Sequence, residues 1–221
     1  MASIVSRAAV IGSGVMGAGI AAHMANAGIS VVLLDIVPDG AEDRSILAGK
    51  AVERLASIRP PALAAPECAC SIRPGNFEDH LALLADVEWV VEAVVEDLAI
   101  KRDVLYRAAM AAPKAAISSN TSTLSLESLV EGMPEAVAKR MLITHFFNPP
   151  RQMKLVEIIC GPSTDSGILA RVEDACDRQL GKSMIRCGDT PGFIANRLGT
   201  YWMCKAVAEA LAQAVAPAQA D

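Results

Sequence analysis

The stretch Ala8-Ala-Val-Ile-Gly-Ser-Gly-Val-Met-Gly17 decides the fold of this 221-residue chain. Its first four residues form an apolar run that is typical of a short buried strand. Three glycines follow with the spacing G-x-G-x-x-G, and apolar residues then recur at helical intervals as far as Gly28. The segment therefore predicts a strand, a tight glycine turn and a helix in immediate succession.

A second apolar run, residues 30–34, ends at Asp35 and completes a unit of the kind that binds dinucleotides. In such a unit Gly12 allows the tight turn, Gly14 lets the backbone approach a pyrophosphate, and Gly17 lets the helix pack closely on the strand. A glycine turn without a ligand would also fit the bare motif. The complete context of strand, turn, helix and acidic residue favours the dinucleotide site.

The helix start and the acidic residue indicate which dinucleotide is bound. Backbone N–H groups in the first helical turn, at Val15 and Met16, would meet the phosphates at the positive end of the helix. The carboxylate of Asp35 would accept hydrogen bonds from the adenosine ribose and would repel a 2′-phosphate. We therefore expect NAD rather than NADP as the cofactor.

The rest of the chain continues the alternation of strands and helices. A region with prolines at positions 60, 61, 66 and 74 should be irregular. Residues 148–152 are too few for a crossover helix, so the strands on either side of them should pair antiparallel. The fold class is thus α/β, a Rossmann-type doubly wound and mostly parallel sheet. Strands are expected at residues 89–95, 115–118, 141–147, 155–159 and 183–186, and helices at residues 41–58, 98–112 and 165–180.

The last part of the chain predicts a separate helix. Thr190-Pro191 combines an N-cap residue with a proline at the first helical position. Apolar side chains follow on one face, among them Leu198 and Trp202, and this face needs a partner surface. We expect an NAD-binding Rossmann domain over residues 1–188. Residues 189–221 should be a linker helix that begins a truncated helical domain, in a homodimer or a larger polypeptide.

Composition excludes several function classes. The formal charge of −5 argues against a nucleic-acid partner, because binding to phosphate backbones needs clustered Lys and Arg. No apolar segment is long enough to span a membrane, and the first residues do not read as a secretory signal. The six cysteines fit reduced thiols in the cytoplasm. Cys68-Ala-Cys70 lacks the spacing of a zinc site, so no metal is expected.

His145 and Glu157 are the candidate acid-base pair. If the loop between the two antiparallel strands closes a hairpin, residues equidistant from Arg151 lie opposite one another, and these two are such a pair. An imidazole beside a carboxylate can act as a general base with its orienting partner. From spacing alone, a histidine satisfied within the core is an equally good interpretation.

Two polar residues could complete the site. Ser122 lies in a polar loop after the strand at 115–118, and loops at the carboxyl ends of parallel strands line the ligand crevice. Asn196 lies near the start of the last helix and could equally be a surface amide.

Five sequence blocks resemble the 3-hydroxyacyl-CoA dehydrogenase family in their order and spacing, and the match covers nearly the whole chain. The Asn148-Pro-Pro-Arg segment looks most like the bacterial dehydrogenases that are fused to an enoyl-CoA hydratase. The blocks are Gly12-Ser-Gly-Val-Met-Gly-Ala-Gly-Ile, Ser119-Asn-Thr-Ser, His145-Phe-Phe-Asn-Pro, Lys154-Leu-Val-Glu-Ile and Thr190-Pro-Gly-Phe-Ile-Ala-Asn-Arg.

The resemblance implies NAD-dependent oxidation of L-3-hydroxyacyl-CoA, an acyl-CoA substrate of fatty-acid β-oxidation. It makes His145 the base and Glu157 its partner, with Ser122 and Asn196 hydrogen-bonding the reacting oxygen. It also places four residues near the nicotinamide half of the cofactor: Glu96, Lys101, Ser122 and Asn148. Read from the residues alone, Glu96 and Lys101 could be a solvated acid at a helix start and a surface base.

The chain departs from the family in two places. The helical hairpin that follows the second strand in the family is shorter here, so Lys50 and Arg54 are only candidate contacts for CoA. The C-terminal helical domain is almost wholly missing, so we expect weak turnover by the isolated chain. Two alternatives stay open: an NAD-dependent dehydrogenase of a non-CoA 3-hydroxy acid, including sugar acids, and a non-catalytic NAD-binding module.

Overall fold

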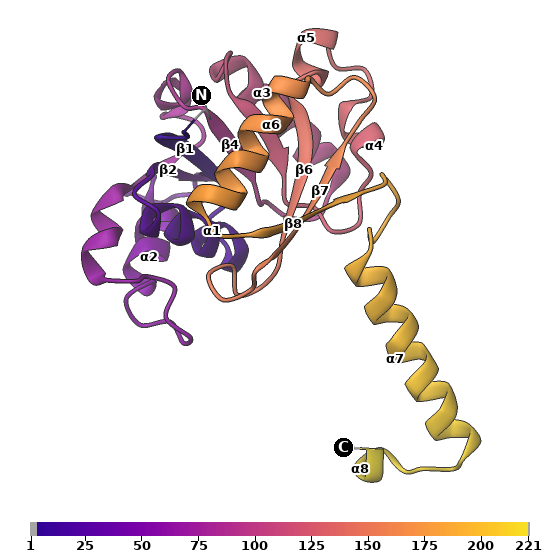
Figure 1. Ribbon diagram of the computed structural model, residues 1–221. Coiled ribbons are helices and arrows are strands. Elements are labelled where there is room, and N and C mark those ends of the chain that lie inside the picture. The colour runs from indigo at the N-terminus through magenta and orange to yellow at the C-terminus, as the bar shows by residue number, and fades with distance from the viewer. Residues whose placement is uncertain (1–3, 221) are drawn as a thin grey trace.

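A computed structural model describes residues 4–220 as one eight-stranded sheet with helices on both faces (Figure 1). The strand order is β3-β2-β1-β4-β5-β6-β7-β8. The strands are β1 (Arg7–Ile11), β2 (Ser30–Asp35), β3 (Ile72–Asn76), β4 (Trp89–Glu92), β5 (Ala116–Ser119), β6 (Met141–Phe146), β7 (Leu155–Cys160) and β8 (Ser183–Cys187). The α-helices are α1 (Val15–Asn26), α2 (Ile46–Arg54), α3 (Leu98–Ala111), α4 (Leu126–Val130), α5 (Glu135–Ala138), α6 (Ser166–Asp174), α7 (Ala195–Ala212) and α8 (Pro217–Ala220).

The sheet is doubly wound, as the sequence predicted. All neighbouring strands pair parallel except β6 and β7, which pair antiparallel across the short connecting loop. The chain runs outward from β1 to β2 and β3, then returns to β4 on the other side of β1. The order of the strands therefore reverses between β1 and β4, and ligands of such sheets bind above that point.

Two apolar cores hold the layers together, one on each face of the sheet. On one face α1 packs through Ile20 and Met24, with α6 beside it. On the other face α3 packs through Leu105 and Ala108. The aliphatic composition of the sequence matches this helix-on-sheet packing.

Two predictions between residues 41 and 76 were wrong. The helix expected over residues 41–58 is only α2, because a turn precedes it in which the side chain of Asp43 accepts a hydrogen bond from Ser45 N. The region predicted as irregular contains β3, with Pro74 inside it. A proline is tolerated there because β3 is the edge strand, where a missing N–H need not break the ladder.

The predicted start of the last helix was also wrong. Gly192 and Phe193 have φ angles of +80° and +46°, which no right-handed helix accommodates, so α7 begins at Ala195 and Thr190 does not cap it. Phe193 is buried in the core instead. Helix α7 projects away from the sheet (Figure 1) and buries none of its own residues; Leu198 and Trp202 are 64% and 70% exposed.

Between residues 4 and 220, no helix combines the length and the apolar character that a membrane span requires. Within the same range, no three His, Cys, Asp or Glu side chains are grouped so that they could hold a metal ion.

Candidate active site

The three glycines of the β1–α1 turn have different surroundings. A Cβ atom at Gly12, where φ is +97°, would lie 2.6 Å from the carbonyl oxygen of Ala93, and one at Gly17 would lie 1.8 Å from that of Gly12. Both positions therefore need glycine for packing. A Cβ at Gly14 would meet nothing within 4 Å. Gly14 borders open space, which fits the close approach of a ligand phosphate.

The N-terminus of α1 opens onto this same space. Gly14 is the N-cap residue and no side chain caps the helix, so the N–H groups of its first turn, at Val15 and Met16, have no side-chain acceptor. The side chain of Val15 is exposed. An uncapped helix start above a glycine turn fits an anionic group such as a pyrophosphate.

Asp35 is held in a fixed orientation at the end of β2. Its Oδ2 atom accepts hydrogen bonds from the backbone N of Ser13, at 2.7 Å, and from the Ser13 hydroxyl. Its Oδ1 atom accepts from the backbone N of Ile36 at 2.7 Å. A carboxylate oxygen has more than one acceptor site, so ribose hydroxyls can still be bound. Ser13 was not recognised from the sequence because any residue fits the second position of the glycine motif.

Lys101 is not a surface base. Its side chain is 1% exposed, and its Nζ atom lies 2.7 Å from Glu92 Oε1, 3.3 Å from Glu96 Oε2 and 3.2 Å from the carbonyl oxygen of Val94. These three partners use the three N–H donors of the ammonium group. Lys101 is thus engaged within the protein, and Glu92, its fully buried partner, was missed by the sequence reasoning.

Glu96 connects the loop after β4 to the loop after β5. It accepts hydrogen bonds from the hydroxyls of Thr121 and Thr123 and, at 3.2 Å, from the backbone N of Ser122. Partial burial raises the pKa of Glu96, but these hydroxyl hydrogen bonds and the charge of Lys101 outweigh it and lower the pKa to about 2. Glu96 is therefore a stable carboxylate that holds Ser122 at the carboxyl end of the sheet.

The predicted pairing of His145 with Glu157 is confirmed. The two residues are register partners across β6 and β7, and His145 Nδ1 lies 2.7 Å from Glu157 Oε2. Their side chains are 8% and 1% exposed. The rings of Phe147 and Phe193 lie 4.6 Å and 5.6 Å from the imidazole, centroid to centroid. With Nδ1–H donating to the carboxylate, Nε2 is left as a proton acceptor.

Glu157 also anchors the start of α7. Its second oxygen, Oε1, accepts hydrogen bonds from Ile194 N at 3.0 Å and Ala195 N at 2.8 Å. This contact brings the exposed side chain of Asn196 to a hollow of about 730 Å³ that Thr123 also lines. Asn196 therefore faces the loop that carries Ser122.

Three candidates from the sequence remain: Asn148, Arg54 and Lys50. Asn148, two residues beyond the end of β6, is exposed. Arg54 lines a hollow of about 220 Å³ together with Gly14 and Val15, whereas Lys50 does not line it. The structure thus brings Arg54, and not Lys50, to the glycine turn.

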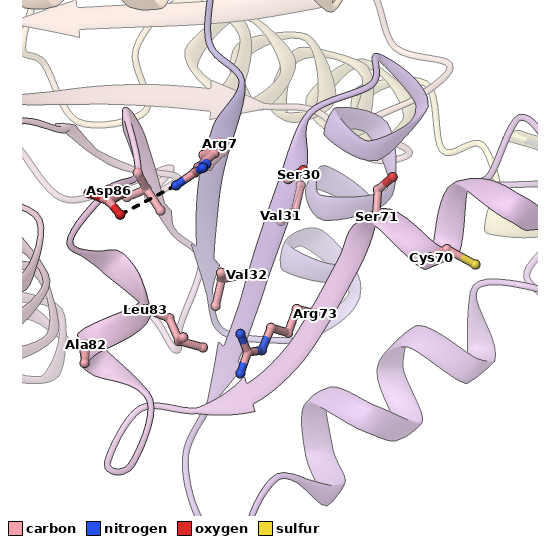
Figure 2. A pocket seen from close by; sticks show the side chains of 12 residues that line it. Arg7, Ser30, Val31, Val32, Cys70, Ser71, Arg73, Ala82, Leu83 and Asp86 are labelled. Carbon is pink, nitrogen blue, oxygen red and sulfur yellow. Dashed lines mark ion pairs between the residues drawn. The ribbon is translucent and has the colours of Figure 1, made fainter.

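A further hollow lies at the opposite ends of the strands. This cavity has a volume of about 450 Å³ and lies over the start of β1, β2 and β3. Figure 2 shows the side chains that line it. The cavity is lined by Arg73 and by Arg7 and Asp86, which form an ion pair at 3.6 Å. The carboxyl-terminal edge that carries Asp35 is on the other side, so this hollow is separate from the candidate site.

Comparisons with known proteins identify the family to which the chain is similar. Residues 7–190 match the family described as "3-hydroxyacyl-CoA dehydrogenase, NAD binding domain". A probable 3-hydroxyacyl-CoA dehydrogenase of Deinococcus radiodurans is 42% identical over 98% of this chain and 63% of its own length. A putative fatty acid oxidation complex trifunctional enzyme of Rickettsia felis is 42% identical over 96% of this chain and 30% of its own length.

Solved structures share the fold. The crystal structure of a 3-hydroxybutyryl-CoA dehydrogenase from Escherichia coli superposes with a TM-score of 0.80 and 31% identity, over 97% of this chain and 44% of the other. FadB2 of Mycobacterium tuberculosis gives a TM-score of 0.79 and 30% identity, over 97% of this chain and 75% of the other. Of the two sequence relatives, from Deinococcus radiodurans and Rickettsia felis, the chain spans less than two thirds of the length.

Proposed function

The chain belongs to the 3-hydroxyacyl-CoA dehydrogenase family, whose NAD-binding domain it contains, and on that premise we propose that it oxidises L-3-hydroxyacyl-CoA to 3-ketoacyl-CoA. The observation that carries the proposal is the 2.7 Å contact between His145 and Glu157 at the carboxyl edge of the sheet. A buried base with a fixed orienting carboxylate suits removal of a hydroxyl proton. The fatty acid oxidation named for the relative from Rickettsia felis supports fatty-acid β-oxidation as its pathway.

The strand order supports a placement for the two halves of NAD. Dinucleotides lie across the point where strand order reverses, here between β1 and β4. The adenosine half would lie over β2, with Asp35 on its ribose, and the pyrophosphate over Gly14. The nicotinamide half would lie over β4 and β5, beside Glu96 and Ser122. Asn148, two residues beyond the end of β6, would border it.

In this arrangement the protein moves one proton and holds one oxygen. His145 Nε2 takes the proton of the substrate 3-hydroxyl, and Glu157 stabilises the imidazolium that forms. Ser122 and Asn196 hydrogen-bond the reacting oxygen as it becomes a carbonyl. Bound NAD supplies the acceptor for the hydride that leaves C3.

The test is NADH formation from L-3-hydroxybutyryl-CoA by the 221-residue chain. In His145→Asn the amide nitrogen keeps the contact with Glu157 and only the proton acceptor is lost, so turnover should fall at least about a hundredfold. The matched control is His80→Asn, where the new amide oxygen can still accept the hydrogen bond from Asn76 N. This control should keep full turnover.

Two outcomes would contradict the proposal. Oxidation of free 3-hydroxybutyrate as fast as its CoA thioester would indicate a dehydrogenase of non-CoA acids. Binding of NAD without turnover of either substrate would indicate a cofactor-binding module.

We also propose that residues 1–188 are the NAD-binding domain and that residues 189–221 pack against a helical partner, either a second copy or a further part of a larger polypeptide. Support comes from α7, whose apolar side chains Leu198, Tyr201 and Trp202 are 64–70% exposed. Light scattering at high protein concentration tests the dimer. A clean monomer would count against self-association.

A further inference from the structure

Glu92 is the centre of a buried polar network beside the candidate site. It is the last residue of β4 and is fully buried. Its Oε1 atom accepts hydrogen bonds from Lys101 Nζ at 2.7 Å and from Val94 N at 2.6 Å. Its Oε2 atom accepts one from Ser119 Oγ, at the end of β5, at 2.6 Å.

The energetics of the buried ion pair between Glu92 and Lys101 favour a role in positioning neighbouring groups over a role in stability. Removing two charges from water costs about as much as their attraction returns, so a buried ion pair is weak support for stability. Removing one partner is costly, however, because the other charge stays buried. Every polar atom of Glu92 and Lys101 has a partner among the described residues. A fully satisfied network of this kind allows few alternative arrangements.

The network connects the two loops that border the nicotinamide half. Lys101, which pairs with Glu92, also lies 3.3 Å from Glu96 Oε2 through its Nζ atom. Glu96 in turn accepts hydrogen bonds from the backbone N of Ser122 and the hydroxyl of Thr123. Glu92 also holds the backbone of the loop after β4 directly, through Val94. A shift at Glu92 would therefore move both loops.

The adenosine half has no part in this network. Asp35 accepts hydrogen bonds from Ser13 and Ile36, and none of these three described residues hydrogen-bonds to Glu92, Lys101 or Glu96. The two halves of the dinucleotide site are thus organised by separate groups of hydrogen bonds.

We propose that Glu92 is a positioning residue that sets the nicotinamide half of the site without touching the cofactor. The inference rests on the proposed function for the placement of the dinucleotide. Loss of the Glu92 carboxylate should therefore weaken binding of the nicotinamide half of NAD and leave binding of the adenosine half unchanged.

The experiment compares NADH with ADP-ribose, which lacks the nicotinamide ring, by titration calorimetry on the full chain. Wild type should bind NADH more tightly than ADP-ribose. In Glu92→Gln, which keeps the side-chain shape, the dissociation constant for NADH should rise about tenfold, the scale of one lost charge-assisted hydrogen bond. The dissociation constant for ADP-ribose should stay within about twofold of wild type.

The matched control is Ser118→Ala, one residue before Ser119 on β5. Ser118 is also fully buried, but its hydroxyl faces the other side of the sheet and accepts hydrogen bonds from Trp89 Nε1 and Thr144 Oγ1, both at 2.9 Å. The Ser118→Ala substitution therefore removes a buried hydroxyl from the same strand and leaves the hydrogen bonds of Glu92 in place. If Glu92→Gln does not yield folded protein, Ser119→Ala cuts the same network at its β5 end and decides the question.

Equal weakening of both ligands in Glu92→Gln, or an equal loss in the Ser118→Ala control, would overturn the inference, since either would reflect general destabilisation. Wild type that binds NADH no more tightly than ADP-ribose would overturn it too. If wild type shows the expected binding pattern but oxidises no hydroxyacyl-CoA, the proposed function fails while the role of Glu92 stands.

Discussion

Replacement of Glu157 by glutamine should stop turnover and leave the fold intact, because the two carboxylate oxygens have different tasks. Oε1 accepts two backbone N–H groups, from Ile194 and Ala195, so this position must remain an oxygen. The amide nitrogen of Glu157→Gln is then forced into the position of Oε2, 2.7 Å from His145 Nδ1. An amide nitrogen only donates, so Nδ1 must become the acceptor and the ring proton must move to Nε2.

The magnitude follows from this change of tautomer. With a proton on Nε2, His145 cannot accept the proton of the substrate hydroxyl. A base held in the wrong tautomer loses about 10³- to 10⁴-fold in kcat, which is about 4–5.5 kcal/mol of transition-state stabilisation. The anchor of α7 is preserved in Glu157→Gln, so Tm should be close to that of wild type. Glu157→Ala removes both contacts and should lower Tm as well.

The assay is kcat for L-3-hydroxybutyryl-CoA with saturating NAD, with Tm measured on the same samples. NADH affinity is the control, because Glu157 does not lie at the dinucleotide site and the affinity should not change. The reasoning is refuted if Glu157→Gln keeps turnover within about tenfold of wild type, since a tautomer error costs far more. It is also refuted if Glu157→Gln loses as much Tm as Glu157→Ala.

The remaining predictions concern stability and the glycine turn. Burial, followed by the charge of Lys182, lowers the pKa of His23 from 6.5 to about 4, so the folded state resists protonation. The stability that His23 contributes is present above pH 6.5 and is lost as pH falls toward 4, by about 2 kcal/mol at pH 5. In His23→Gln the amide can still donate to Leu180 O, so the free energy of unfolding measured in urea should fall by that much less between pH 7.5 and pH 5 than in wild type. The same fall with pH in both proteins would contradict this prediction. Gly17→Ala should lower both Tm and NADH affinity, since its Cβ would lie 1.8 Å from a backbone oxygen. Gly14→Ala should keep the wild-type Tm and weaken only NADH binding, because its methyl meets no protein atom but enters the space for the pyrophosphate. Calorimetry and thermal melts of this pair check both, and a loss of Tm in Gly14→Ala would show that the space is not open.

Local patterns predicted the parts of the site that depend on neighbours in the chain. The unit from β1 through α1 to Asp35 follows from glycine spacing and apolar periodicity over about thirty residues. The facing of His145 and Glu157 follows from hairpin symmetry, because antiparallel strands joined by a short loop have one register. The resemblance to a known family added roles for Ser122 and Asn196 that no spacing indicates.

Other parts depend on contacts between distant segments, and these the sequence could not predict. From the sequence alone, Pro74 indicates an irregular segment, and only the position of β3 at the edge of the sheet explains why a strand forms there. Thr190-Pro191 reads as a helix start, but burial of Phe193 beside His145 imposes left-handed backbone there and delays α7 to Ala195.

The sequence by itself thus determined the fold class, the dinucleotide unit and the pairing of His145 with Glu157, since each is encoded in periodicity, turn chemistry or hairpin register. Only the tertiary structure decided how the pair and the cofactor site are held: Ser13 on Asp35, Glu92 on Lys101, and Glu157 on the start of α7. The physical reason is that these polar groups are satisfied by partners 9 to 38 residues away in the chain, and burial selects such partners in space rather than in sequence.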